Sequence, residues 1–215
     1  MQDNFVPYES ESPRKWREDD PRRLRMAEKR ASILSAARPI LLRDGLGGTT
    51  LDRVASEGGI AKMTLYRHFP SKEALFEGLV ASMCDQMREW LENAPVPDAG
   101  TPANQLASEL HAFTSVLLEP DALSLYRLLV ADGWRFPDLA RVFEQSGMKV
   151  IRRRIAGLLE AGGVPSHSSA TVAAEVVALA LGDAYQRAIL GIADEGDSEV
   201  FARQIEAAVI HGLGG

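Results

Sequence analysis

Helix-breaking residues divide this chain into segments whose apolar residues recur at helical spacing. The first such segment carries Leu24, Ala27, Ala31 and Leu34 on one face and stops at Gly45. Further stops fall at prolines, at paired glycines and in a proline-rich loop at residues 94–100, and no strand pattern follows that loop. The sequence therefore predicts an all-α fold of about nine helices. Their expected ranges are 24–44, 49–57, 61–68, 71–90, 102–118, 121–134, 138–161, 169–191 and 198–212.

Composition divides the chain into three parts. Residues 1–21 hold three prolines among many charges and no periodic apolar residues, which predicts a flexible arm. We expect a first domain over residues 22–78 and a second over residues 79–215, a length that allows one or two cores. The chain shows neither a long apolar run nor the apolar core of a secretory signal, so we expect a cytoplasmic protein.

Charge is distributed unevenly between these parts. The whole chain has 24 Lys and Arg against 30 Asp and Glu. Residues 22–72 alone have eleven Lys and Arg against four Asp and Glu. A basic segment on an acidic body can attract a polyanion such as nucleic acid, while the acidic remainder limits indiscriminate binding. A solvated charged face without a partner is the alternative reading.

Residues 49–68 have the pattern of a helix-turn-helix. Two short helical segments flank paired glycines, which force a tight turn between them. Thr49 followed by Asp52 resembles a capping box that would open the first short helix, and Ser71 would cap the long helix that follows. The apolar residues that would pack these short helices on each other and on the first long helix are Leu51, Val54, Ala55, Ile60 and Leu65.

The second short helix has polar and aromatic side chains on its outward face, where Tyr and Met would normally be avoided. The residues at its N-terminal end, which in such motifs faces base edges, are Lys62, Met63 and Thr64. Tyr66 and His68 can donate hydrogen bonds to phosphates, and Lys72 falls beside the N-terminal amides of the next helix. This set predicts a DNA-binding surface in which the first three residues supply sequence preference.

Residues 49–76 read TTLDRVASEGGIAKMTLYRHFPSKEALF, and residues 33–37 read ILSAA. Together these residues resemble the DNA-binding domain of the TetR family of transcriptional regulators. Two positions depart from the family pattern, because Pro39 is unusual inside its first helix and Ala61 replaces the Ser that often caps its recognition helix. The resemblance implies a dimeric, all-helical regulator, typically a repressor that a small molecule releases from its operator. It also implies phosphate contacts from Thr50, Thr64, Tyr66, His68 and Lys72, with Lys62 and Met63 nearest the bases.

The second domain carries a further resemblance and the candidate dimer helices. Residues 125–140 read LYRLLVADGWRFPDLA and resemble the C-terminal domain of AefR-like members of the family, which implies a regulator of efflux or stress genes.

Residues 171–190 are apolar nearly all round, so that helix must be covered. We predict that it forms the four-helix seam of a homodimer with the last helix, although a core within a monomer is the alternative. The apolar stripe of the last helix is Val200, Phe201, Ile205, Ala208 and Val209.

Aromatic and sulfur-containing side chains of the second domain could line a cavity for a small hydrophobic effector. The predicted ligand-binding residues are Met87, Phe113, Leu117, Tyr126, Trp134, Phe143 and Tyr185. Asp132, Arg135 and Gln186 are candidate polar anchors. A ligand that prefers the conformation with wrongly spaced DNA-binding domains would release the DNA. Ordinary core packing is the alternative reading of each aromatic residue.

Other classes of function find less support in the sequence. An enzyme would need a converging nucleophile, base or metal set, and the four histidines lie far apart with no metal-ligand spacing. We therefore expect no catalytic residue, no metal and no cofactor. Cys84 lies in an apolar helical setting and is predicted to be a buried, unreactive thiol. The alternative function is a helical adaptor that binds another protein, with an incidental basic segment.

Overall fold

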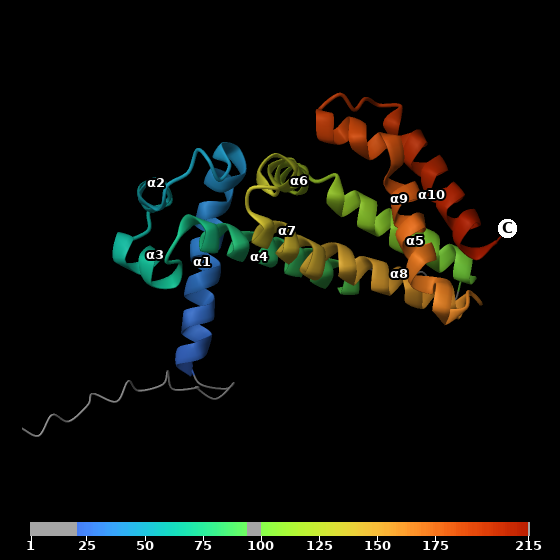
Figure 1. Cartoon of the computed structure of the whole chain (residues 1–215), viewed down its shortest axis with the longest axis horizontal. Coiled ribbons are helices and arrows are strands. Elements are labelled where there is room, and N and C mark those ends of the chain that lie inside the picture. The colour runs from blue at the N-terminus through green and yellow to red at the C-terminus, as the bar shows by residue number, and fades with distance from the viewer. Residues whose placement is uncertain (1–20, 94–99, 215) are drawn as a thin grey trace, which may run out of the picture.

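The computed structural model describes residues 21–93 and 100–214, which are helical apart from short connections (Figure 1). A π-helical segment at Glu144–Met148 joins two α-helices without a break, and with these three counted as one the described residues form the nine predicted helices. The elements are α1 (Pro21–Asp44), α2 (Leu51–Glu57), α3 (Lys62–His68), α4 (Lys72–Asn93), α5 (Pro102–Leu117), α6 (Pro120–Asp132), α7 (Pro137–Phe143), α8 (Lys149–Ala161), α9 (Ser166–Leu190) and α10 (Asp197–Leu213).

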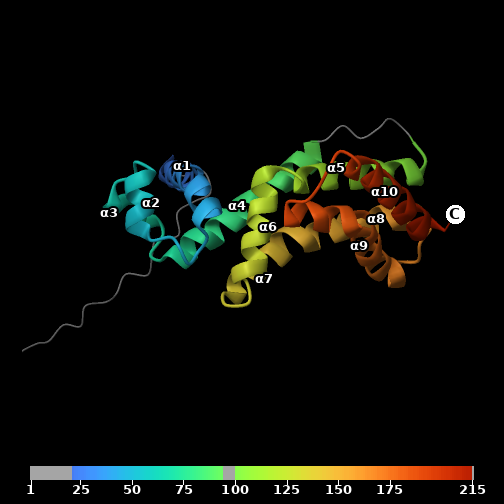
Figure 2. The ribbon, with the colours of Figure 1, turned by 90° about the horizontal axis from the view of Figure 1, so that it is seen from above.

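The helices form two parts along the long axis of the molecule. We call α1, α2 and α3 the head and α4 to α10 the body, and α4 runs from the head into the body (Figures 1 and 2). The predicted arm lies outside the described residues except for Pro21, the first residue of α1. The predicted loop also lies outside them except for Gly100.

None of the helices in the described part of the chain has the length and hydropathy needed to cross a membrane.

Capping side chains set the boundaries of the head helices. The hydroxyl of Thr50 accepts a hydrogen bond from the amide of Arg53 at 3.2 Å and begins α2. The predicted capping residue, Thr49, was therefore wrong by one position: its buried hydroxyl donates instead to the carbonyl of Gly45 at 2.7 Å. Ser71 caps α4 as predicted, because its hydroxyl accepts from the amide of Ala74 at 3.1 Å.

The turn between α2 and α3 depends on a glycine. Gly59 has a φ of +61°, a left-handed conformation that residues with a β-carbon rarely adopt. By contrast, α3 begins without a side-chain cap, because Ala61 occupies the capping position. The recognition helix of the predicted motif is therefore present but lacks one of its usual stabilising hydrogen bonds.

Two apolar cores hold the described residues together. The first joins the head to the near half of α4 and continues into α6 and α7 through Leu125, Leu128 and Leu139. The second lies between α5, α8, α9 and α10 and includes Phe113 and Phe201. The first core therefore extends well past residue 78 and packs residues of α6 and α7 together with those of the head.

Candidate nucleic-acid interface and ligand cavity

Helix α3 is attached by one side chain and presents the others. Leu65 is fully buried and packs α3 on the first core. Met63 is 82% exposed and Tyr66 is 44% exposed, while Lys62 is also at the surface. Met63 is the most exposed large apolar side chain among the described residues. The helix thus offers the predicted set of side chains on its outer face.

Asp52 of α2 holds two of these side chains in place. The ammonium of Lys62 lies 3.0 Å from one carboxylate oxygen of Asp52, and the hydroxyl of Tyr66 donates to the other at 3.2 Å. The contact with Lys62, followed by that with Tyr66, lowers the pKa of the Asp52 carboxyl below its usual value. Asp52 therefore holds the ammonium of Lys62 and the hydroxyl of Tyr66 at the surface, where either group could exchange the carboxylate for a phosphate.

The remaining predicted phosphate contacts lie around α3 with different partners. Thr50 is exposed beside its capping bond, Thr64 is half-buried, and the ammonium of Lys72 donates to the carbonyl of Leu46 at 2.9 Å. Burial, followed by nearby Arg and Lys side chains, lowers the pKa of His68, so a neutral imidazole with one N–H donor is favoured. Each group keeps a free donor for a phosphate oxygen.

An ion-pair network that the sequence did not predict fixes α2 against the end of α1. Arg43 pairs with both Asp44 and Glu57, each at 2.8 Å, and Arg53 pairs with Asp44 at 3.0 Å. These arginines lower the pKa of both carboxyls, with Arg43 the largest cause for each. The network joins residues on separate helices, so spacing along the sequence gave no sign of it.

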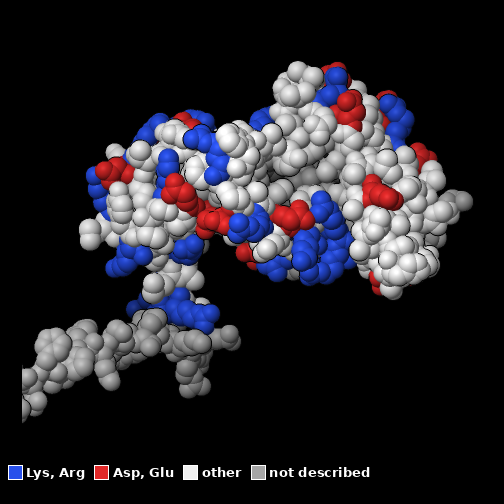
Figure 3. Space-filling view, in the orientation of Figure 1, with Lys and Arg blue, Asp and Glu red and all other residues white. Residues whose placement is uncertain are grey.

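Lys and Arg side chains appear on several sides of the head and at the lower end of α1 (Figure 3). Arg30 links that end of α1 to the motif, because its guanidinium lies 4.1 Å from the centre of the Phe69 ring and donates to the carbonyl of His68 at 3.1 Å. The basic character predicted from composition is therefore displayed at the surface, where a polyanion can reach it.

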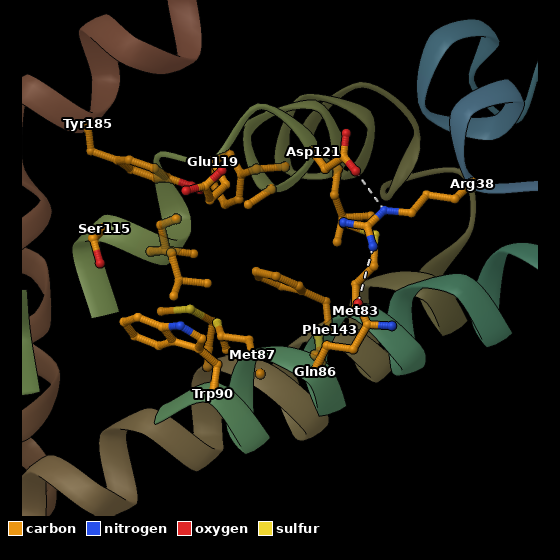
Figure 4. Close-up of a pocket in the computed structure, with 18 residues that line it drawn as sticks. Arg38, Met83, Gln86, Met87, Trp90, Ser115, Glu119, Asp121, Phe143 and Tyr185 are labelled. Carbon is orange, nitrogen blue, oxygen red and sulfur yellow. Dashed lines mark hydrogen bonds and ion pairs between the residues drawn. The ribbon is translucent and has the colours of Figure 1, made fainter. Parts of the chain in front are cut away.

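A cavity of about 330 Å³ lies in the body, where the two cores meet. Its walls are mainly apolar and come from α4, α5, α6, α7, the π-helical segment and α9, with one side chain from α1 (Figure 4). The π-helical turn widens the helix at Gly147, where a β-carbon would lie 3.2 Å from the sulfur of Cys84. The size and lining match those of small-molecule sites.

Five of the seven predicted ligand-binding residues line this cavity, namely Met87, Leu117, Tyr126, Phe143 and Tyr185. The structure does not bring the other two to it. Phe113 is fully buried in the second core, and Trp134 is 79% exposed in the turn after α6, where its indole N–H donates to the carbonyl of Ala131 at 2.9 Å.

The polar groups at the cavity differ from those the sequence suggested. Asp132 and Arg135 lie outside it, and Gln186 lines only a neighbouring hollow beside Tyr185. The cation that lines the cavity is Arg38, which was not among the predicted polar anchors. Arg38 comes from α1, so its arrival at a cavity in the body depends on how α1 packs against α4 and α6.

Two ionisable side chains of the cavity lining are held in their protonated, neutral forms. Burial raises the pKa of the Cys84 thiol to about 12, which confirms the predicted unreactive thiol. Burial also raises the pKa of the Tyr185 phenol, which stays protonated and able to donate. Tyr126 packs edge-on against both Tyr185 and Phe143, with ring centres 5.6 and 6.1 Å apart. No cluster of described residues has the composition of a metal site.

The surface of α9 and α10 differs from the stripe that the sequence indicated. Phe201, Ile205 and Ala208 are buried in this chain's own core, so they are not available to a partner. The exposed large apolar side chains of this helix pair are instead Leu179, 42% exposed, Leu190, 70% exposed, and Ile210, 55% exposed, and small residues of α9 are also exposed.

Comparison with known proteins agrees with this architecture. Residues 33–79 match the family described as bacterial regulatory proteins of the tetR family. Residues 104–211, half of the chain, match the AefR-like transcriptional repressor C-terminal domain. The chain therefore belongs to the TetR family of transcriptional regulators, with an AefR-like C-terminal domain.

Individual relatives are more distant. The chain is 29% identical over 132 residues to the regulator AlkX of Mycobacterium tuberculosis, and the matched residues cover 61% of each protein. It is 25% identical to the regulator YdeS of Bacillus subtilis over 61% of this chain and 63% of that protein. The chain thus spans about six tenths of the length of these curated relatives.

Solved structures share the whole fold. The flavonoid-responsive regulator FrrA is 30% identical, with a TM-score of 0.70 over 87% of this chain and 96% of that one. A TetR-family regulator from Mesorhizobium loti has a TM-score of 0.76 at 24% identity, over 88% of this chain and 96% of that one. The second likeness shows a common fold and no more.

Proposed function

We propose that this regulator is a homodimeric repressor that acts in the cytoplasm and leaves its operator when a small hydrophobic effector enters the body. The proposal divides the chain into a DNA-binding domain at residues 22–78 and an effector-binding and dimerisation domain at residues 79–215. The observation that carries it is the pairing of an outward-facing α3 with an apolar cavity that shares a core with the head.

The DNA-binding role rests on the outer face of α3 and its surroundings. Lys62, Met63 and Thr64 stand at the N-terminal end of α3, where they would meet base edges in the major groove. The phosphate contacts would come from Thr50, Tyr66, His68 and Lys72. Exposed Met63 would gain an apolar contact such as a thymine methyl, which would remove part of its surface from water.

The dimer would pair α9 and α10 of one subunit with those of a second copy. Leu179 and Ile210 are exposed apolar residues on these helices, and small residues such as Ala174 and Ala178 allow close approach. Two-fold symmetry would then place two copies of α3 on successive major grooves, about 34 to 36 Å apart.

The effector would occupy the cavity at Met87, Leu117, Tyr126, Phe143 and Tyr185. FrrA is described as flavonoid-responsive and has the same fold, which makes flat aromatic compounds the first class to test. A compound that binds one head spacing better than the other would change operator affinity by the usual allosteric factor of about 5- to 150-fold.

The test measures binding of the purified protein to the DNA upstream of its own gene, by fluorescence anisotropy over a series of salt concentrations. We expect a steep loss of affinity with salt, and Lys72→Ala should reduce the slope by about one while keeping sequence preference. Lys62→Ala should instead reduce the preference for operator over unrelated DNA. Lys149→Ala, an exposed lysine of α8, serves as the matched control and should change neither.

A flat salt response would favour the alternative, a helical adaptor with an incidental basic head. Addition of aromatic compounds to the complex tests the regulatory half. If every compound that binds the protein leaves operator affinity unchanged, ligand release is excluded. A protein that stays monomeric at the concentrations that bind DNA would exclude the homodimer.

A further inference from the structure

Arg38 connects three helices at the end of the cavity nearest the head. Its Nη1 donates to the amide oxygen of Gln86 on α4 at 3.2 Å, and its Nε lies 2.7 Å from a carboxylate oxygen of Asp121 on α6. Both contacts are drawn in Figure 4, which shows the guanidinium facing the cavity between those two partners. The side chain belongs to α1, so the head itself contributes a wall of the effector site.

The pairing of Arg38 is incomplete in a way that leaves room for a ligand. Its Nε is buried and has no hydrogen-bond partner within the described residues, because its N–H is not directed at the nearby oxygen of Asp121. Asp121 is 53% exposed and therefore well solvated, which weakens the ion pair. A buried donor of a guanidinium gains most from an acceptor that fits its planar geometry.

Arg38 also differs in charge from the rest of the lining. Of the described residues that line the cavity, it is the single Lys, Arg or His, and most of the others are apolar. The two carboxylates are Asp121, already beside Arg38, and Glu119, which is exposed and lies toward Tyr185 in Figure 4. Water screens Glu119, so an anion bound at Arg38 would feel little repulsion from it.

The inference drawn from these contacts rests on the proposed function, because it concerns the effector of the same cavity. We propose that the effector is an amphipathic anion whose carboxylate or phenolate oxygen binds Arg38 in place of Asp121. Its apolar part fills the space between Met87, Trp90 and Phe143. A guanidinium binds a carboxylate through two parallel hydrogen bonds and can donate to the single oxygen of a phenolate, whereas an apolar compound without an acceptor leaves Nε unsatisfied.

The exchange of partners gives the effector a direct route to the head. Asp121 stands in the first turn of α6, and its contact with Arg38 ties α6 to α1. An effector that takes Arg38 releases that tie while remaining in contact with α4 through the apolar walls. The spacing of the head relative to α6 then depends on whether the anion is bound.

The test compares pairs of probes that have similar shapes but differ in charge. Binding of biphenylcarboxylate and biphenylcarboxamide to the full chain is measured by isothermal titration calorimetry, with hydroxyflavone and methoxyflavone as the phenolate pair above the pKa of the phenol. At least one anionic probe should bind about tenfold more tightly than its neutral partner. The two pairs show whether a carboxylate or a phenolate is preferred.

Two variants and a control assign the anion preference to Arg38, and a fourth variant is held in reserve. Arg38→Gln should reduce the anion preference to about onefold, while Asp121→Asn should raise affinity for the anionic probe several-fold and leave the neutral probe unchanged, because the competing carboxylate is gone. Arg88→Gln is the control, since Arg88 on α4 pairs with Asp85 on the same helix and does not line the cavity. If Arg38→Gln does not fold, Arg38→Lys replaces it, because lysine keeps the charge without the planar guanidinium. Arg38→Lys should bind the anionic probe about threefold more weakly than the wild-type protein.

The outcomes separate this inference from the function on which it rests. Equal binding of charged and neutral probes to the wild-type protein, or a preference that survives in Arg38→Gln, would overturn the role of Arg38 and leave the cavity as an effector site. A chain that binds none of the four probes would count against both the cavity and the anion.

Discussion

The head and the body of this protein solve opposite packing problems. In the head, Leu41, Val54 and Leu65 are fully buried, and Asp52 of α2 already contacts two polar side chains of α3. The body keeps a cavity of about 330 Å³ between two cores and gives up the packing that would fill it. The head is closely packed behind its exposed polar face, whereas the body keeps a space that a guest could occupy.

The position of the cavity matters as much as its size. It lies where the first core, which includes the head, meets the second core, which includes α9 and α10. Helix α6 contributes Leu125 to the first core and also lines the cavity. A guest at this seam would contact both cores, which gives it a route to change how the head sits relative to α9 and α10.

The largest expected effect compares two phenylalanines. Phe69→Ala should lower the free energy of unfolding by about 3–5 kcal/mol, because Phe69 is fully buried in the first core. Phe143→Ala should cost on the order of 1–2 kcal/mol, because one face of Phe143 already lacks partner atoms at the cavity. Urea unfolding at one fixed protein concentration measures both. Equal losses would show that the cavity is filled or closed in solution, and that the contrast between head and body is wrong.

A smaller effect is expected at the start of α3. Ala61→Ser should raise the free energy of unfolding by about 1 kcal/mol, because a serine hydroxyl can accept a hydrogen bond from an amide of the first turn that Ala61 leaves uncapped. Ala31→Ser, at an exposed position inside α1, is the matched control and should be slightly destabilising. Thermal unfolding of both variants gives the comparison. No gain in Ala61→Ser would mean that the start of α3 is already satisfied by another group.

The smallest effect is a dependence of head stability on acid. The pKa values of Asp44 and Glu57 lie below their ordinary values of 3.8 and 4.5 in the folded protein, mainly because of Arg43. Their contribution is therefore present above those values and is lost as the pH falls through the lower, folded pKa values. Glu57→Gln should make the melting temperature less sensitive to pH below about 4.5. Glu89→Gln, at an exposed position on α4, is the control and should retain the wild-type dependence on pH. An unchanged dependence in Glu57→Gln would show that the ion-pair network does not contribute to acid sensitivity.

Much of the head could be predicted from residues close together in sequence. The turn at Gly59, the cap at Ser71 and the buried side of Leu65 each follow from interactions within a few residues. The one-residue error at Thr49 has the same origin, because adjacent threonines offer equivalent hydroxyls and only the path of the chain after α1 decides which one caps α2. Three of the lining residues, Met87, Leu117 and Tyr126, could also be predicted, because each is a large apolar or aromatic side chain within a predicted helix.

What the sequence determined by itself is the list of helices, the exposed face of α3 and the family to which the chain belongs. The tertiary structure alone decided that Trp134 points to solvent, that Phe201 faces its own core and that Arg38 reaches the cavity. Helical periodicity fixes which side of a helix is apolar, but it does not fix what that side meets. Arg38, Gln86 and Asp121 are brought together by three separate helices, and such contacts arise only when the packing of the whole chain is complete.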